Sequence, residues 1–339
     1  MKSMMTIVML MLMATSCSHA QETGSSADDY YRRADGKKGA QLKTALCEII
    51  YNRTEGGSLS DAYKALWTHF QKTDAKENGK VWDMYSNLRE FTFGTDQAGQ
   101  YSQEGDVYNR EHSWPNSWFG GKVMPMYTDL HHLYPTDGYV NNRRSNYPFG
   151  ETKGEKYQSA NNFSKLGACT YPGYTGIVFE PNDEYKGDFA RTYFYMVTCY
   201  EEKLADWYQT CADCRPTIDG STYPGLTSWQ LEMLMKWAAQ DPVSQKEVNR
   251  NNAVYDIQQN RNPFIDYPGL EQYIWGNLKD KAFSYNHYDA TAIQTIRQQQ
   301  DASQQERVWS TDGKRSTKSR RGIQIVKKKN GKAVKVIKR

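Results

Sequence analysis

The segment 109–151 brings together residue types that can hydrolyse a phosphodiester bond. It holds three of the six histidines of the chain, with carboxylates, carboxamides and arginines between them. At neutral pH this reaction needs a base with a pKa of about 7, a hard cation that stabilises developing negative charge, and donors that hold the phosphate. His112, the pair Glu111 and Asn141, and a nearby arginine have the right chemistry for these roles. A polar surface loop, with histidines that only fill the core, is the structural alternative.

These residues lie in three motifs that resemble the endonuclease I family, which are secreted or periplasmic nucleases with a ββα-metal (His-Me finger) active site. The motifs are Asn-Arg-Glu-His-Ser-Trp-Pro at 109–115, Asp-Leu-His-His-Leu-Tyr-Pro at 129–135 and Val-Asn-Asn-Arg-Arg-Ser-Asn-Tyr-Pro-Phe-Gly-Glu at 140–151. Further blocks lie at 179–181, 186–195 and 261–264, so the resemblance covers roughly residues 30–275. Because several separated blocks agree in their order, the resemblance is specific.

The resemblance implies that His112 is the general base and that Glu111 and Asn141 are the protein ligands of one Mg²⁺ per site. Water and phosphate oxygens would complete the coordination, and other divalent cations can substitute. This agrees with the chemistry of Mg²⁺, a hard ion that keeps several waters and takes one or two protein oxygens. No other cofactor is expected.

A transition-state phosphate also needs a cationic donor, and the planar fork of arginine can hold two oxygens. Arg144 and Arg191 lie in blocks that resemble the family, with Arg110 and Arg261 behind them. We therefore predict catalytic roles for Arg144 and Arg191. The alternative for each arginine is an ion pair with an internal carboxylate. The phosphate-binding arginine of the family lies in a variable loop, so the resemblance does not assign it to one position.

Geometry sets a condition on this site, because adjacent residues on a regular strand point to opposite faces. Glu111 and His112 can both serve one site only if their strand ends, twists or bulges there, and Pro115 favours an irregular ending. We expect oxygens of Glu111 and Asn141 to reach a common ion. We also expect a backbone carbonyl to hold one ring nitrogen of His112, which leaves the other as an acceptor.

His131 and His132 are weaker candidates, because each could orient a ligand or fill the core. Asp129 could steady one of the arginines.

The apolar periodicity predicts an α+β fold in which a mainly helical domain surrounds a small ββα-metal (His-Me finger) motif, the motif itself following from the resemblance. Helices are expected at 40–51, 60–71, 138–146, 191–203 and 229–239. Strands are expected at 81–85 and 107–114, with a short strand or turn at 128–134.

The chain divides by composition into a signal peptide at 1–20, a nuclease-like domain at 21–290 and a polar, then basic, tail at 291–339. Residues 314–339 contain 12 Lys or Arg and no Asp or Glu, which leaves 31 basic and 39 acidic residues, a balance of −8, in residues 1–313. Two apolar runs around Asn330-Gly331 predict a hairpin, which is marginally stable unless it packs on something else. The tail could bind polyanions, serve in sorting, or only solvate the chain end. Its hairpin is similar to the last two strands of sorting domains on some Gram-negative secreted proteins.

The amino terminus is typical of an export signal, with Lys2 before an apolar run that is too short to span a bilayer. Cleavage after Ala20 gives simple secretion, which we favour, whereas a lipobox interpretation would make Cys17 a lipid anchor. No transmembrane helix is expected. Five cysteines remain outside the signal, and Cys211 and Cys214 could form a zinc half-site, a redox pair or a local disulfide. An incidental or structural role is favoured for this pair, because no second ligand pair follows.

The sequence therefore predicts an exported Mg²⁺-dependent endonuclease that cuts DNA, with RNA as a second substrate, shows little sequence preference and leaves 5′-phosphate ends. The localisation would be secreted, periplasmic or cell-surface, and no segment indicates an obligate protein partner. One alternative is a surface nucleic-acid-binding protein with a decayed nuclease site. Another is a metallohydrolase that acts on a small nucleotide.

Overall fold

The computed structural model describes residues 30–51 and 59–288, together with four backbone strands in the tail. The predicted signal segment lies outside the described residues. The helices are α1 (Gly39–Ile50), α2 (Leu59–Thr73), α3 (Gly138–Arg144), α4 (Lys186–Cys199), α5 (Leu204–Thr210), α6 (Ser228–Gln240), α7 (Gln245–Gln258), α8 (Pro263–Asp266) and α9 (Leu270–Ile274). Within the described part of the chain, no helix is both long and apolar enough to cross a membrane.

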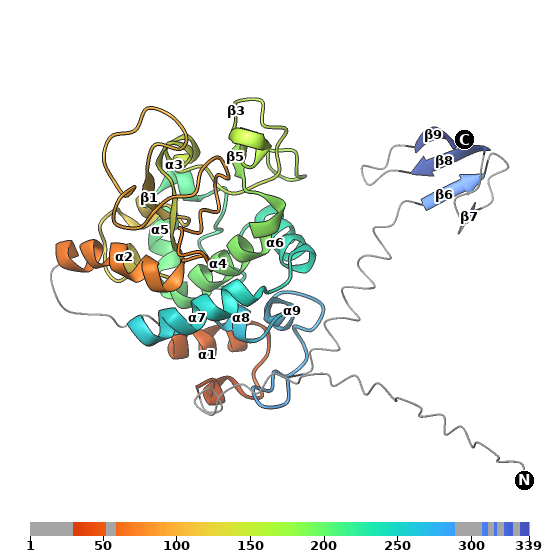
Figure 1. Ribbon diagram of the computed structural model, residues 1–339. Coiled ribbons are helices and arrows are strands. Elements are labelled where there is room, and N and C mark those ends of the chain that lie inside the picture. Colours follow the sequence, from red (N-terminus) through yellow and green to blue (C-terminus); the bar gives the residue numbers. More distant parts are fainter. Residues whose placement is uncertain are drawn as a thin grey trace, which may run out of the picture.

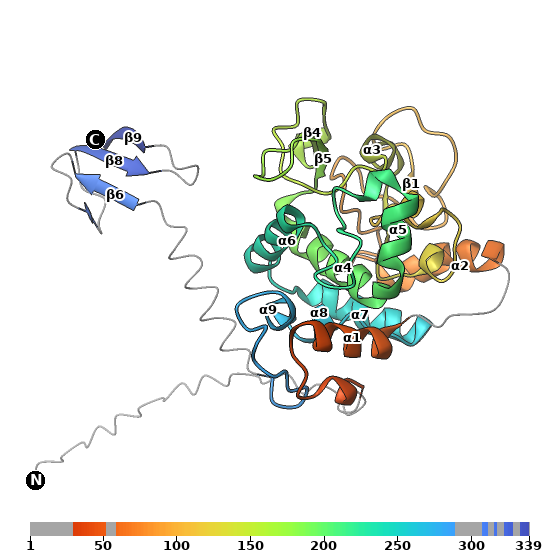
Figure 2. The same ribbon diagram turned by 180° about the vertical axis from the view of Figure 1, so that it is seen from behind.

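The hydrophobic core is built around α4, which is buried along its whole length. In both views of the ribbon, α4 runs through the middle of the helical part, with α1 and α7 below it and the segment of β1 and α3 above (Figures 1 and 2). Phe189, Tyr193, Phe194 and Val197 are among the residues of α4 that enter the main core. A helix that is buried on all sides must have neighbours that cover its apolar residues and pair with its charged ones, as the ion pair of Arg191 with Glu247 shows. This central position makes α4 the scaffold on which the other elements are placed.

A small antiparallel pair of strands precedes the short helix α3. The strand β1 (Tyr108–His112) pairs with β2 (Leu133–Asp137), and Tyr108 lies opposite Asp137. The helix α3 follows β2 directly, because Asp137 caps it by accepting the backbone N–H groups of Tyr139 and Val140, both at 2.9 Å. The order strand, strand, helix brings the first and third motifs of the sequence side by side.

A second sheet has the order β3-β4-β5, from β3 (Tyr157–Gln158), β4 (Lys165–Ala168) and β5 (Ile177–Glu180). The tail forms an antiparallel sheet in the order β7-β6-β8-β9, from β6 (Arg307–Ser310), β7 (Arg315–Ser316), β8 (Gly322–Lys327) and β9 (Ala333–Lys338). The predicted hairpin is therefore confirmed as β8 and β9, and it packs edge to edge on β6, which the sequence analysis missed.

The predicted α+β class is confirmed, and most predicted helices match within a few residues. The helix expected at 191–203 begins earlier, at Lys186, and ends at Cys199. The strand within 128–134 begins only at Leu133.

The strand predicted at 81–85 is wrong. Only isolated bridges form around it, from Val81 to Ala75 and from Lys80 to Thr92. The carboxylate of Asp83 accepts the backbone N–H groups of Tyr85 and Ser86, at 2.8 and 3.3 Å, and so turns the chain. An Asp that bonds the backbone two residues ahead offers an alternative to a sheet ladder.

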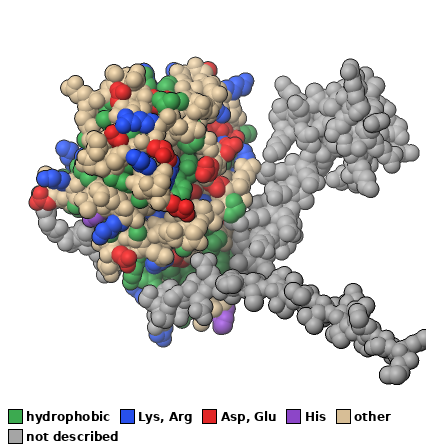
Figure 3. Space-filling model, viewed as in Figure 1, with side chains coloured by type: hydrophobic (Ala, Val, Ile, Leu, Met, Phe, Trp, Pro, Cys, Tyr) green, Lys and Arg blue, Asp and Glu red, His purple; other side chains and the backbone are tan. Residues whose placement is uncertain are grey.

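Charged side chains on the face shown in Figure 3 are mixed in sign. Basic side chains are scattered over that face, while acidic side chains gather right of its centre. This agrees with the acidic balance of residues 1–313.

Candidate active site

The strand β1 carries Glu111 and His112 at its end, and it stays in regular register with β2 through both residues. Their side chains therefore point to different sides, as the alternation of a strand requires. Glu111 contacts Tyr85 and Arg144, whereas the His112 ring stacks on Tyr127 at 4.9 Å between centroids. The ladder ends at His112, so the irregular ending expected from the sequence begins directly after these two residues.

His112 is held by a backbone carbonyl, as predicted. Its Nε2 lies 3.0 Å from the carbonyl oxygen of Tyr127. Because a carbonyl can only accept, Nε2 carries the hydrogen and Nδ1 is left with its lone pair. Burial lowers the pKa of His112 to about 3, with His132 adding a repulsive contribution. The imidazole is therefore neutral at neutral pH and can accept a proton at Nδ1.

Glu111 is a buried carboxylate with one engaged oxygen. Its Oε1 accepts from the Tyr85 hydroxyl and from Nη1 of Arg144, both at 2.8 Å. Among the described residues no side chain donates to Oε2. Burial raises the pKa of Glu111, and the positive charge of Arg144 opposes that rise. One oxygen of this group is thus fixed by the protein and the other remains available.

Asn141 lies in α3, three residues before Arg144, and is half-buried. Its backbone carbonyl accepts from the N–H of Ser145 at 3.0 Å. No hydrogen bond of its carboxamide is found among the described residues. The same residues contain no group of three or more His, Cys, Asp and Glu that could hold a metal. The predicted ligands, the Glu111 carboxylate and the Asn141 carboxamide, are only two in number and do not form such a group. That they bind a common Mg²⁺ ion stays a prediction.

Arg144 is buried at the end of α3 and joins that helix to the end of β1. Besides Glu111, its Nη1 bonds the carbonyl of His112 at 3.0 Å, and Nη2 bonds the carbonyl of Ser113. Its side chain is only 1% exposed, and its Nε has no partner. The geometry gives Arg144 a positioning role for Glu111, and the predicted direct role in catalysis stays untested.

Arg191 lies in α4, apart from the polar contacts of Glu111 and His112. It donates to both carboxylate oxygens of Glu247 and to the carbonyl of Asp241. Arg261, which was ranked behind Arg144 and Arg191, forms an ion pair with Asp266 at 2.7 Å. Both arginines have the internal carboxylates that the alternative interpretation required. The predicted catalytic role of Arg191 also stays untested.

The histidines of the second motif are buried beside β2. Nε2 of His132 lies 2.7 Å from the carbonyl of Met126, and Nε2 of His131 lies 3.2 Å from that of Asn260. Asp129 does not steady an arginine, contrary to the sequence-based expectation. Its carboxylate accepts from the hydroxyls of Tyr195 and Tyr200 and from the amide of Gln258. This part of the motif therefore holds the loop between β1 and β2 against α4.

None of the five described cysteines forms a disulfide. The Sγ of Cys214 donates to the carbonyl of Cys211 at 3.1 Å, so the local disulfide considered for this pair is not formed. The described residues contain no group of three or more His, Cys, Asp and Glu that would give this pair the further ligands of a zinc site.

Sequence reasoning missed the residues that hold the site from distant segments. Tyr85 comes from the turn after Val81, Tyr127 contributes a carbonyl, and Tyr63 from α2 stacks on Tyr127 at 4.5 Å between centroids. None of them lies in a sequence motif, and no local pattern marks a backbone carbonyl or an aromatic contact across the fold.

Comparisons with known proteins identify the family of this chain. Residues 38–269 match the model of the family described as Endonuclease I. The extracellular ribonuclease of Bacillus amyloliquefaciens is 37% identical over 262 residues, which cover 74% of this chain and 79% of that protein. The extracellular ribonuclease of Bacillus subtilis is 35% identical over 74% of this chain and 80% of its own length. An extracellular deoxyribonuclease of Aeromonas hydrophila is 29% identical over 42% of this chain and 50% of that protein. The chain, with its strand-strand-helix unit and its adjacent Glu111 and His112, belongs to the endonuclease I family of nucleases.

Proposed function

We propose that this protein is an exported, Mg²⁺-dependent endonuclease whose strand-strand-helix unit acts as a His-Me finger. The observation that carries this proposal is His112, because its Nε2 is fixed on the Tyr127 carbonyl and its Nδ1 keeps a free lone pair. A buried imidazole that is neutral at neutral pH can act as a general base. Its lowered pKa keeps the imidazole unprotonated at neutral pH, but it also makes His112 a weaker base than one with a pKa of about 7.

Glu111 and Asn141 fit the requirements of a Mg²⁺ ion. Oε2 of Glu111 and the carboxamide of Asn141 have no side-chain donors among the described residues, and both are hard oxygen ligands. The ion, when bound, would supply positive charge to the scissile phosphate and to the departing oxygen. Arg144 would hold Glu111 in place, since it fixes the other carboxylate oxygen.

The residues of the chain support a direct hydrolysis. Nδ1 of His112 takes a proton from water, and the water oxygen forms a bond to phosphorus. The bond from phosphorus to the 3′ oxygen breaks, so the phosphate remains on the 5′ end. The Tyr127 carbonyl stabilises the imidazolium that forms, because it accepts from Nε2–H in both protonation states.

DNA and RNA are both proposed substrates. The relatives with the greatest coverage of this chain are named ribonucleases, while others are named deoxyribonucleases. The relatives are also named extracellular or periplasmic, which supports export by a signal peptide at residues 1–20. We further propose that residues 21–290 form the nuclease domain and that the basic tail is a sorting or polyanion-binding appendage, with Cys17 as a lipid anchor only if the lipobox is used.

The test is incubation of the mature protein with supercoiled DNA and with RNA, each with Mg²⁺ and with EDTA. Wild-type protein should cut at least one polymer with Mg²⁺ and neither with EDTA. His112→Ala should lower kcat by about 10²- to 10⁴-fold, the usual contribution of a general base. Its circular dichroism should stay unchanged. Binding without cutting in the wild-type protein would instead indicate a decayed nuclease, and near-normal activity in His112→Ala would remove the mechanism.

A further inference from the structure

Arg110 lies two residues before His112 on β1, so the two side chains share one face of the strand. Its guanidinium carbon is 3.5 Å from the ring centroid of Tyr63 and 4.3 Å from that of Trp67, both in α2. Nη1 donates to the backbone carbonyl of Tyr63 at 2.7 Å. These contacts fix the plane of a half-buried guanidinium beside the proposed base.

The charge of Arg110 is not compensated by a carboxylate among the described residues. Arg144, Arg191 and Arg250, which are all buried, have a carboxylate partner. Arg110 has only aromatic rings and a carbonyl around it, and its Nε and Nη2 groups donate to no described carboxylate. A half-buried cation without a nearby carboxylate is available to bind an incoming anion.

Arg110 and His112 are linked by the same aromatic cluster. The ring of Tyr63 lies under the guanidinium and is also stacked near His112, with 6.3 Å between the two ring centroids. Tyr127 stacks on both Tyr63 and His112. An oxygen anion next to the His112 ring would therefore meet the guanidinium on the same side of the strand.

We infer that Arg110 binds a non-bridging phosphate oxygen of the nucleic acid at the His112 site. This inference rests on the proposed function and assigns the phosphate contact that the buried Arg144 and Arg191 do not supply. The free Nε and Nη2 groups can donate to phosphate oxygens in the fork geometry that arginine favours. The rings of Tyr63 and Trp67 keep this fork ordered before substrate arrives, which reduces the entropy lost on binding.

The first test compares Arg110→Gln with Arg215→Gln in cleavage of DNA or RNA, whichever the wild-type protein cuts. Arg215 is a matched control, because it also lies over a tyrosine ring, donates to backbone carbonyls and lacks a described carboxylate, but it follows α5. Arg110→Gln should lower kcat/KM by about 100-fold, the usual loss for one transition-state donor. Arg215→Gln should leave it unchanged.

The second test measures how salt weakens binding of a fluorescent DNA duplex, with turnover stopped by His112→Ala. Loss of one phosphate contact should reduce the slope of log K against log salt by about 0.9 in Arg110→Gln. Arg110→Lys keeps the charge and the stem, so it should fold and retain the slope, yet cleave more slowly than wild type because the planar fork is lost.

Each outcome bears on the inference. A folded Arg110→Gln variant with wild-type kcat/KM and an unchanged slope would show that Arg110 only ties β1 to α2. If Arg110→Gln does not fold, Arg110→Lys decides, since wild-type turnover in that variant overturns the fork contact between the guanidinium and the phosphate. Failure of the proposed function is distinguishable, because the wild-type protein itself would then not cut.

Discussion

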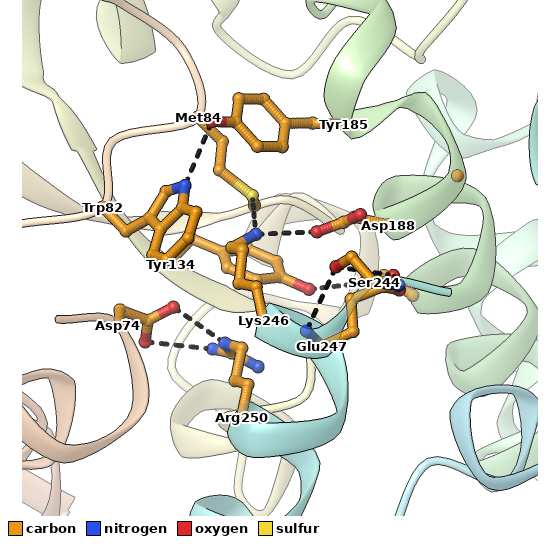
Figure 4. A network of polar contacts seen from close by, with 12 residues as sticks. Asp74, Trp82, Met84, Tyr134, Tyr185, Asp188, Ser244, Lys246, Glu247 and Arg250 are labelled. Atoms are coloured by element: carbon orange, nitrogen blue, oxygen red, sulfur yellow. Dashed lines mark hydrogen bonds and ion pairs between the residues drawn. The ribbon is translucent and has the colours of Figure 1, made fainter. Parts of the chain in front are cut away.

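Charged side chains are buried both around α7 and around β1. The two regions differ in whether these side chains have partners of opposite charge. Lys246 of α7 pairs with Asp188 of α4 at 2.7 Å, and Arg250 of α7 pairs with Asp74, which directly follows α2, at 2.8 Å (Figure 4). Ser244 caps α7 with a reciprocal bond to Glu247. Each of these charges meets an opposite charge inside the protein.

The site around β1, in contrast, contains polar and charged groups without a described hydrogen-bond or ion-pair partner. Oε2 of Glu111 has no described side-chain donor, the carboxamide of Asn141 has no described partner, and Arg110 has no described carboxylate. Unmet bonding capacity is not confined to this site, because Trp114 Nε1, Trp118 Nε1 and Thr198 Oγ1 are also buried without a hydrogen-bond partner among the described residues. The comparison teaches that completed ion pairs build the scaffold around α7, whereas the open groups around β1 are those that the proposed function assigns to metal and phosphate.

Glu111→Gln and Asp74→Asn form a matched pair that can break this comparison. Each change removes a carboxylate from a buried arginine, so each should lower the free energy of unfolding by about 3–5 kcal/mol. Only Glu111→Gln should also lower kcat by about 10³-fold in the folded protein, because it removes the proposed metal charge. Urea titrations and cleavage at saturating Mg²⁺ measure the two effects. Equal activity in both variants would contradict the distinction.

Asn141→Ala sharpens the comparison, because this side chain has no described hydrogen bond to lose. Its unfolding free energy should change by less than about 0.5 kcal/mol, as for surface positions. The Mg²⁺ concentration needed for half-maximal activity should rise by about 10- to 100-fold, if the carboxamide is a ligand. Asn142→Ala is the control, since Asn142 is the exposed neighbour on the same helix. A lower stability without a changed metal requirement would identify Asn141 as structural.

A further expected effect, on stability and not on activity, is a pH dependence from the second motif. Burial lowers the pKa of His131 from 6.5 to about 4. Between these values the unfolded chain binds a proton that the folded protein does not, so stability falls as the pH falls from 6.5 towards 4. Each unit of lowered pKa corresponds to about 1.4 kcal/mol.

Thermal unfolding of wild type and His131→Gln across this range provides the measurement. The raised pKa of Asp83, about 8, acts in the opposite direction, because the folded state then binds the extra proton. Comparing the slopes of the two proteins cancels that contribution. The slope should be flatter in His131→Gln, and parallel slopes would rule out His131 as the cause.

The sequence predicted those parts of the fold whose information is local. The helix α3 could be predicted because Gly138 to Asn146 has helical character before Pro148, and β1 because an extended run ends before Pro115. The strand expected at 81–85 failed because one carboxylate, that of Asp83, bonds the backbone ahead of it. A strand prediction from the spacing of apolar residues does not take a hydrogen bond from a side chain to the backbone into account.

The candidate site was predictable in residue type but not in its surroundings. The carbonyl bond of His112 follows from imidazole chemistry, while the residue that supplies the accepting carbonyl, Tyr127, could not be named. Arg144 and Arg191 were selected from motifs, yet burial and partner carboxylates depend on contacts between distant segments. Arg110 was ranked behind these two for the same reason. Its partners Tyr63 and Trp67 come from a helix that the motif does not include.

The turn that begins at Asp83 holds both ligand-bearing elements at once. Its Oδ2 accepts the backbone N–H of Asp137 at the start of α3, and two residues later the hydroxyl of Tyr85 bonds Glu111. Loosening this single stretch would release the carboxylate and the helix of the carboxamide together. The ring of Tyr85 also packs on Phe189 of α4, with 5.7 Å between the centroids. Assembly of the working centre and integrity of the helical core therefore depend on the same turn, and a change that weakens one is expected to weaken the other.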